Sequence, residues 1–244
     1  HDCCRCLDGP VGNVNKLYSM INQRILIAII LVAIVLVLVF TELSYRRLEL
    51  PTEITRKFAH FTSTLSTILF PFIFTSHWSV LVLAVFFFLI LFFSRHGSKL
   101  NSIHKIERKS VGSFILPVAI YVTFLVSWLL REKFFYILPI LILGICDPMA
   151  SILGMNLKRN NRHIRIFGHT MKKTVLGTLS FLICSFLISV IALYIYMGVF
   201  NFKTFWLALA VSVTATVTEL FAGKGWDNLF IPLSVQLVLI FFLS

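Results

Sequence analysis

Acidic residues are rare in this chain, and three of them lie at or inside long apolar runs. The sequence contains 10 Asp and Glu among 244 residues. Asp147 ends one apolar run, Glu219 lies within another, and Asp227 follows it after a Gly-Lys-Gly segment. A carboxylate in an apolar run is costly unless it is paired, protonated or bound to a metal. Because Mg²⁺ prefers oxygen ligands, we expect these three carboxylates to hold one or two Mg²⁺ ions.

Basic residues follow Asp147 in a linker that contains no acid. The linker carries Lys158, Arg159, Arg162, Arg165, Lys172 and Lys173. Ammonium groups neutralise phosphate oxygens, and the N–H groups of a helix start bind anions. We therefore expect Lys172, Lys173, the helix N-cap Thr174 and Gly177 to bind a triphosphate. The alternative is that the bases only mark membrane topology and that Asp147 only caps a helix.

A second polar stripe precedes another apolar run. Glu53, Arg56, Lys57 and His60 follow the spacing i, i+3, i+4, i+7 and share one face of a helix. Such a stripe is costly in lipid, so it should face the protein interior or water. We expect Arg56 and Lys57 to bind the triphosphate and His60 to act in the chemistry. The alternative is that the two bases extend to the membrane interface and that Glu53 favours a helix start.

Two shorter segments add weaker candidates. Glu107 to Ser113 reads ERKSVGS before an apolar run, and a plain loop with an N-cap Ser explains it nearly as well. Residues 223–228 read GKGWDN after the run that holds Glu219. From these segments we expect Arg108, Lys224 and Asn228 to contact the nucleotide.

The elements that position these residues are membrane helices. Hydrophobic residues make up 58% of the chain, charged residues make up 13%, and the mean hydropathy is +0.92. Period-2 alternation is absent, which argues against a barrel. We predict an all-α polytopic transmembrane helix bundle of seven to eight spans. The segments lie at about 25–43, 57–74, 78–93, 111–130, 134–153, 174–197, 204–222 and 228–243.

The loop charges predict which side of the membrane carries the polar clusters. With eight spans, 16 of the 22 Lys and Arg residues fall in the loops between spans 1–2, 3–4, 5–6 and 7–8, counting Lys57 at the edge of the second span. The positive-inside rule places those loops, and the polar clusters with them, on the cytoplasmic side. The net charge of +12 therefore reflects topology, and we expect no nucleic-acid partner.

We expect the chain to hold one domain after a short N-terminal segment. Cys3, Cys4 and Cys6 lie in that segment, and no second set of ligands at the spacing of a zinc site accompanies them. We expect residues 1–19 to be an N-terminal extension, native or non-native, before a single integral-membrane domain at 20–244. The first apolar segment predicts an anchor and not a removed signal peptide.

The chain resembles the membrane family of CTP-dependent lipid-alcohol kinases, which includes dolichol kinase, phytol kinase and the CTP-using diacylglycerol kinase. The matching pieces, in order, are ExxRKxxH at 53–60, ERKSVGS at 107–113, DPMASILG at 147–154, KKTVLGT at 172–178 and TELFAGKGWDNLxIP at 218–232. The resemblance implies a kinase-like domain that transfers the γ-phosphate of CTP to a lipid alcohol with Mg²⁺. The chain departs from the family at Cys146 and Lys158, where the family has Gly, and at Leu176, where the family has Glu.

The resemblance gives the candidate residues roles. Asp147, Glu219 and Asp227 would hold Mg²⁺, and the bases, Lys173 among them, would stabilise charge on the transferred group. His60 or Asp147 would accept the alcohol proton. The alternatives are a related CDP-diacylglycerol synthase, which attacks CTP at the α-phosphate, an anion or lipid transporter, and a non-catalytic scaffold.

Overall fold

The computed structural model describes residues 25, 28–29, 32, 35–36, 39–40, 52–96, 111–156, 163–166, 169–223 and 225–243. The described residues before 52 are helical and exposed. The elements that follow are α2 (Thr52–Ser66), η1 (Thr67–Leu69), α3 (Phe70–Ile73), α4 (His77–His96), α6 (Gly112–Leu130), α7 (Phe134–Leu141), η2 (Ile142–Cys146), α8 (Asp147–Asn156), β1 (His163–Ile166), β2 (His169–Thr174), α9 (Val175–Met197), α10 (Phe202–Phe221) and α11 (Asp227–Leu243).

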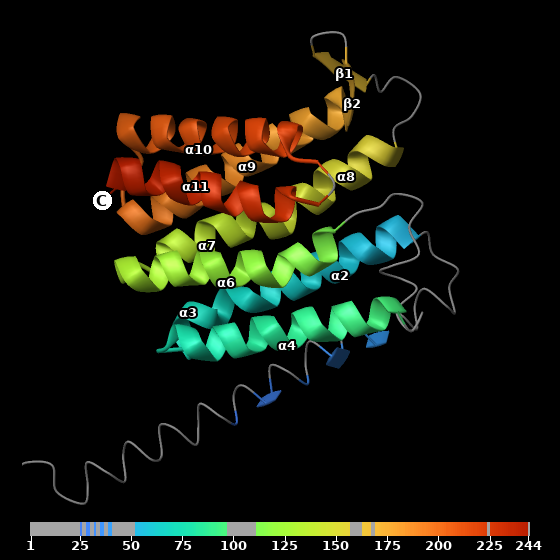
Figure 1. Cartoon of the computed structure of the whole chain (residues 1–244). Coiled ribbons are helices and arrows are strands. Elements are labelled where there is room, and N and C mark those ends of the chain that lie inside the picture. Colours follow the sequence, from blue (N-terminus) through green and yellow to red (C-terminus); the bar gives the residue numbers. More distant parts are fainter. Residues whose placement is uncertain are drawn as a thin grey trace, which may run out of the picture.

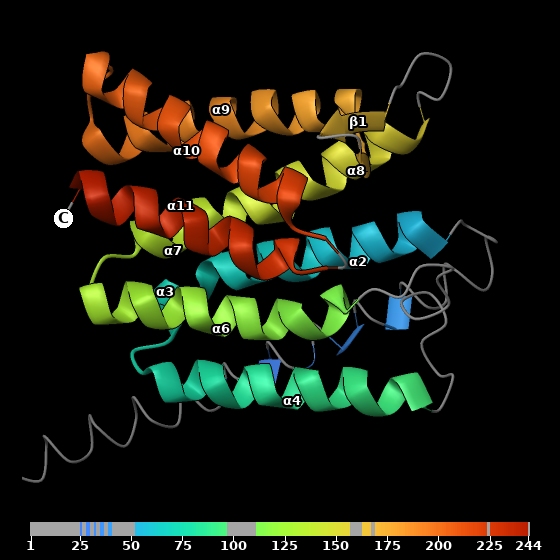
Figure 2. The same ribbon diagram turned by 45° about the horizontal axis from the view of Figure 1, so that its top comes forward.

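The long helices lie side by side with their axes roughly along one direction (Figures 1 and 2). Helices α9 and α10 form one side of the bundle and α4 the other, with α6, α7 and α11 between them, and α2 packs against η2, α7 and α8. At one end of the bundle α2, α6, α9 and α11 begin and α4, α8 and α10 end. We call this the charged end, because Lys57, Asp147, Lys173, Glu219 and Asp227 lie there.

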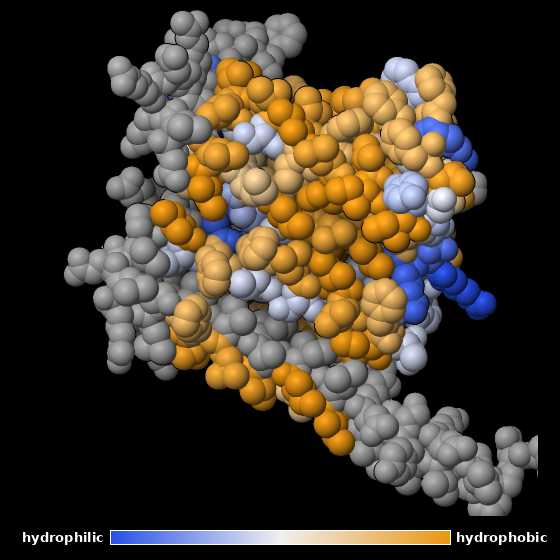
Figure 3. Space-filling view, turned by 180° about the vertical axis from the view of Figure 1, so that it is seen from behind, coloured by the Kyte–Doolittle hydropathy of each residue, from blue (hydrophilic) through white to orange (hydrophobic). Residues whose placement is uncertain are grey.

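Four helices are long and apolar enough to cross a membrane, judged by length and composition: Gly112–Leu130, Phe134–Met155, Val175–Met197 and Phe202–Phe221. Two shorter apolar helices, His77–Phe93 and Asp227–Leu243, accompany them among the described residues. Hydrophobic side chains cover the middle of the face shown in Figure 3, as a lipid-facing surface requires. The structure thus agrees with an all-α membrane bundle, whereas a count of seven to eight spans stays a prediction.

One part of the chain is not helical. Residues predicted only as a loop form an antiparallel hairpin of β1 and β2, in which Arg165 pairs with Thr170 and Ile166 with His169. The second strand ends at Thr174, whose side chain accepts a hydrogen bond from the Gly177 backbone N–H at 3.2 Å. The predicted N-cap is therefore confirmed, and the hairpin leads directly into α9.

The long apolar helix Phe134–Met155 contains a local irregularity. Pro139 lies within α7, and the five residues that follow α7, Ile142–Cys146, form a single π-helical turn, η2. Such turns are rare in proteins, and those that occur are often found at functional sites. Within η2, Gly144 allows close contact with α2, because a Cβ added there would lie 3.1 Å from Thr64 Cγ2. The turn places Asp147 at the start of α8, against α2.

The core consists of two apolar clusters. One joins α7, α9, α10 and α11 and is built on residues such as Leu138, Phe181 and Ile231. The other joins α3, α4, α6 and α7. Gln236 is 1% exposed within the bundle, and its Nε2 donates to the carbonyl oxygens of Thr123 and Phe135, each at 2.8 Å. This amide ties α11 to α6 and α7 away from water.

Candidate active site

The first part of the site is a buried ion pair between α2 and α8. Lys57 Nζ lies 2.6 Å from Asp147 Oδ2, and the two side chains are 9% and 5% exposed. Lys57 is on the predicted polar stripe, and Asp147 begins the helix that follows η2. At Lys57 the stripe therefore faces the protein interior. Two charges can stay in an apolar bundle because each neutralises the other.

His60 lies one turn further along α2 and faces the same carboxylate. Its Nε2 is 3.8 Å from Asp147 Oδ2, which is too long for a hydrogen bond. This nitrogen is buried and has no hydrogen-bond partner among the described residues. Arg56, on the same helix, is half-buried and interacts electrostatically with His60. The described residues thus place an imidazole nitrogen that none of them bonds beside the Asp147 carboxylate.

The second part of the site joins β2, α10 and α11. Lys173 Nζ is in hydrogen-bond contact with Glu219 Oε1 and lies 3.5 Å from Asp227 Oδ2. Burial lowers the pKa of Lys173, but the Glu219 and Asp227 carboxylates outweigh it and raise the pKa above its usual value. The other oxygen of Glu219, Oε2, is buried and has no partner within the described part of the chain. Lys173 is thus a cation held between two acids.

The two parts belong to one electrostatic cluster. Asp147 interacts electrostatically with Lys173 as well as with Lys57, and its charge also reaches Glu219 and Asp227. The cluster gathers residues that are up to 170 positions apart in the sequence, from Lys57 to Asp227, at one end of an apolar bundle. Intramembrane charges gathered in this way mark functional sites by default.

Close packing of α8 on α9 fixes the position of Lys173. A Cβ added at Gly177 would lie 3.0 Å from the Ala150 carbonyl oxygen, and one at Gly154 would lie 2.9 Å from Thr174 Oγ1. The two glycines therefore allow the end of α8 and the start of α9 to approach each other, and the Gly177 N–H donates to the Thr174 cap. These contacts give Thr174 and Gly177 a packing role, and their contact with nucleotide stays a prediction.

The remaining predicted residues have different positions. Asn228 is buried, and its Nδ2 donates to the Gly112 carbonyl oxygen at 2.8 Å, which joins α11 to the start of α6. Lys172 lies in β2 next to Lys173. Arg108 and Lys224 lie outside the described residues. Nucleotide contact by all four stays a prediction.

Sequence patterns did not reveal how the charges pair. The sequence predicts that Lys57 binds the triphosphate and that Asp147 binds the metal, whereas the structure pairs the two side chains with each other. The available signal was that a lone acid at an apolar helix end needs a cation from another segment, although spacing alone does not say which. No pattern in the sequence indicates the π-helical turn before Asp147.

The fit of the site to Mg²⁺ rests on its donor atoms. In the part of the chain that the structure describes, no three His, Cys, Asp or Glu side chains form a group that could hold a metal ion by themselves. A Mg²⁺ ion bound with a nucleotide takes only one or two carboxylates, and phosphate oxygens and water complete its shell. Glu219 Oε2, which has no partner among the residues that the structure describes, is a suitable oxygen, and Asp227 Oδ2 lies 3.5 Å from the shared Lys173. The donor set therefore fits a Mg²⁺–nucleotide.

Comparison with known proteins identifies a similar protein that is a kinase. The chain is 28% identical over 189 residues to the phytol kinase of Synechocystis sp., and the match covers 77% of this chain and 78% of that protein. No family model matches the chain, and no solved structure is significantly similar to it. The similarity supports the lipid-alcohol kinases as a group and does not distinguish one member from another.

Proposed function

We propose that this protein is a membrane-embedded kinase that transfers the γ-phosphate of CTP to the hydroxyl group of a lipid alcohol. The alcohol would be a polyprenol or dolichol, a phytol-like alcohol or diacylglycerol. The observation that carries the proposal is the cluster at the charged end, where Lys57, Asp147, Lys173, Glu219 and Asp227 meet. The similarity to a phytol kinase supports the same reaction class. The choice of CTP rests on the family resemblance of the motifs.

The lysines supply charge that phosphate oxygens can use. Lys57 and Lys173 are each held by carboxylates in the structure. Their flexible side chains can turn from carboxylate to phosphate oxygens when a triphosphate enters, and Arg56 and Lys172 stand next to them in sequence. Phosphoryl transfer depends mainly on positioning and on charge stabilisation, so cations at fixed helix ends suit it.

The carboxylates would hold the metal. Asp147, Glu219 and Asp227 are the candidate ligands, and one oxygen of Glu219 has no partner in the described part of the chain. A bound Mg²⁺ ion neutralises charge on the β- and γ-phosphates. Exchange of partners, lysines to phosphate and carboxylates to metal, would leave no charge buried alone.

His60 is the better placed of the two candidate bases. Asp147 already accepts a hydrogen bond from Lys57, whereas His60 Nε2 has no partner among the described atoms. In the proposed reaction the alcohol oxygen bonds to the γ-phosphorus as the bond to the β–γ bridging oxygen breaks. The alcohol proton passes to His60 Nε2, and the products are the lipid phosphate and CDP. Asp147, at 3.8 Å, stabilises the imidazolium that forms.

The test is transfer of label by protein purified in detergent. With Mg²⁺ and an isoprenoid alcohol or diacylglycerol, we expect radiolabel from γ-labelled CTP to appear in the lipid. Asp147→Asn should abolish this transfer, whereas Glu132→Gln, which changes an acid beyond the opposite end of α6, should not. Label that enters the lipid only from the α-position would instead indicate a cytidylyltransferase. No transfer from CTP or ATP would favour a transporter or scaffold.

A further inference from the structure

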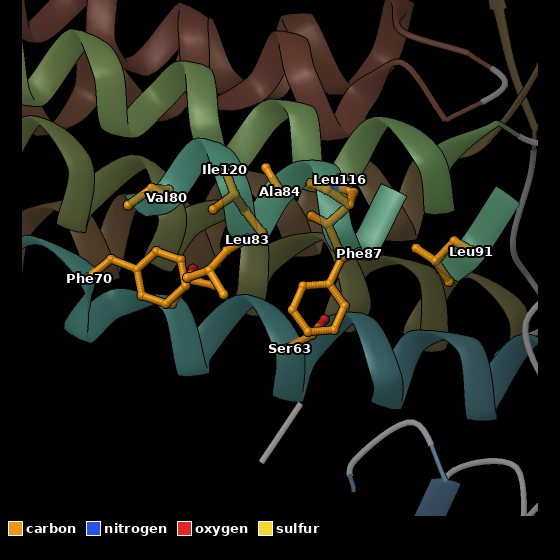
Figure 4. Close-up of a pocket in the computed structure, with 11 residues that line it drawn as sticks. Ser63, Phe70, Val80, Leu83, Ala84, Phe87, Leu91, Leu116 and Ile120 are labelled. Carbon is orange, nitrogen blue, oxygen red and sulfur yellow. The ribbon is translucent and has the colours of Figure 1, made fainter. Parts of the chain in front are cut away.

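An apolar cavity lies beside the charged cluster, between α2, α4 and α6. Its volume is about 80 Å³. Figure 4 shows Phe70 and Val80 at one end of the cavity, Leu91 at the other, and Phe87 above Ser63 between them. Since Val80 and Leu91 are eleven residues apart on one helix, the cavity extends roughly 16 Å along the bundle.

Helix α2 forms a wall of both the cavity and the charged cluster. Ser63, which lines the cavity, follows His60 by three residues, so their positions along the helix axis differ by only about 4.5 Å. The Leu91 end of the cavity lies toward the charged end of the bundle. A chain in the cavity would therefore have its head close to His60 and Asp147.

The cavity lining favours hydrocarbon over water. Its hydroxyl groups are those of Ser63 and Thr67, and both donate to nearby carbonyl oxygens of α2, Ser63 to Ala59 at 2.6 Å and Thr67 to Thr64 at 2.7 Å. A buried water needs two to four polar partners, which this lining does not offer. Protein interiors pack to the density of organic crystals, so an apolar void in a membrane bundle gains contacts when a chain fills it.

We infer that the α2–α4–α6 cavity binds the hydrocarbon tail of a single-chain lipid alcohol, with the hydroxyl at His60. The inference rests on the proposed function for the identity of the head group. The cavity is small beside the roughly 300–1,000 Å³ of typical ligand pockets, so it accommodates a stretch of one chain and not two. Polyprenyl or phytyl alcohols fit this requirement, and diacylglycerol does not.

Photolabelling tests the inference without relying on turnover. The probe is an isoprenoid alcohol with a diazirine at its tail, added to the full-length protein in detergent. We expect label on peptides from α2–α3 and α4, with competition by unlabelled phytol but not by diacylglycerol. Label confined to other helices, or equal competition by diacylglycerol, would overturn the inference.

A variant pair adds a matched comparison. Ala84 lines the cavity, whereas its neighbour Val85 is 48% exposed on the lipid-facing side of α4. Ala84→Phe should lower labelling about tenfold, Ala84→Leu should lower it less, and Val85→Phe should leave it unchanged. Equal labelling of all three variants would reject the cavity as the site.

The two proposals fail in different ways. Phosphorylation of the alcohol without labelling in the cavity rejects the tail site and leaves the kinase. Labelling in the cavity without phosphorylation from CTP or ATP rejects the kinase and leaves a lipid-binding cavity.

Discussion

The substitution Lys57→Met tests whether Asp147 is held as a buried charge. Lys57 and Asp147 are 8% and 4% exposed, and their nitrogen and oxygen atoms are 2.6 Å apart. Methionine keeps the length and apolar stem of lysine but removes the ammonium group. Asp147 then retains His60 at 3.8 Å and the more distant field of Lys173. The carboxylate is left buried without its main counterion.

The expected loss is large because the remaining charge stays out of water. Breaking a buried ion pair by removing one partner costs about 3–5 kcal/mol. For a chain of this length, each kcal/mol shifts the melting temperature by about 2–4 °C, so we expect a fall of about 6–20 °C. Removing both charges avoids the penalty, and Lys57→Met with Asp147→Asn should recover most of the stability. That double variant should still lack activity, because the carboxylate and the ammonium are both gone.

The measurement is thermal melting of the detergent-solubilised protein, followed by intrinsic fluorescence, alongside the label-transfer assay. Lys203→Met serves as the control, because Lys203 is exposed at the other end of the bundle and its loss should change stability by less than about 0.5 kcal/mol. A single Lys57→Met variant with the same melting temperature as the wild type would refute the buried ion pair. A double variant no more stable than the single one would show that the stranded charge is not the cause.

Three further predictions concern other parts of the charged end. Gly177→Ala should cost about 1–3 kcal/mol in thermal melts, because its Cβ would lie 3.0 Å from the Ala150 carbonyl oxygen, whereas Gly223→Ala meets nothing within 4 Å and should be neutral. Burial lowers the pKa of Lys173, but neighbouring carboxylates outweigh it, so its pairs stabilise the fold below its ordinary pKa of 10.5 and are lost as the pH rises through the raised value. The wild-type melting temperature should thus fall more steeply above pH 10.5 than that of Lys173→Met, and parallel curves would contradict the pairing. Chelation of Mg²⁺ should stop label transfer, and Glu219→Gln should raise the Mg²⁺ concentration needed for half the maximal rate; an unchanged requirement would remove Glu219 from the metal site.

The meeting of the acids and bases was predictable from the sequence. Asp147, Glu219 and Lys173 all adjoin ends of apolar segments, and counting the segments places those ends on one side of the membrane. Charged groups near lipid gather where they can pair, so a shared site was the natural expectation. The structure brings these three residues into one cluster. The period-3.6 stripe likewise identified the face of α2 that holds Lys57 and His60.

The partners within the cluster were not predictable in the same way. A stripe shows which side chains share a face, but the choice between Lys57 and Lys173 as partner of Asp147 depends on how far α2 and α8 slide past each other. That offset follows from contacts such as Gly144 against Thr64, which leave no periodic signal. The partner of Asn228 was also not predictable, because its hydrogen bond to the Gly112 carbonyl oxygen depends on where α6 begins.

The orientation of Asp147 shows why the helical period alone was insufficient. In an uninterrupted α-helix each residue turns by about 100°, so Met149 would share a face with the buried Leu138 and Asp147 would point roughly opposite to it. The structure shows Met149 45% exposed and Ala150 4% exposed, a displacement of the buried face by one residue. The single π-helical turn at Ile142–Cys146 accounts for this, since it adds about one residue to one turn. The same rotation moves Asp147 away from the face opposite Leu138, and in this rotated position Asp147 contacts Lys57 of α2.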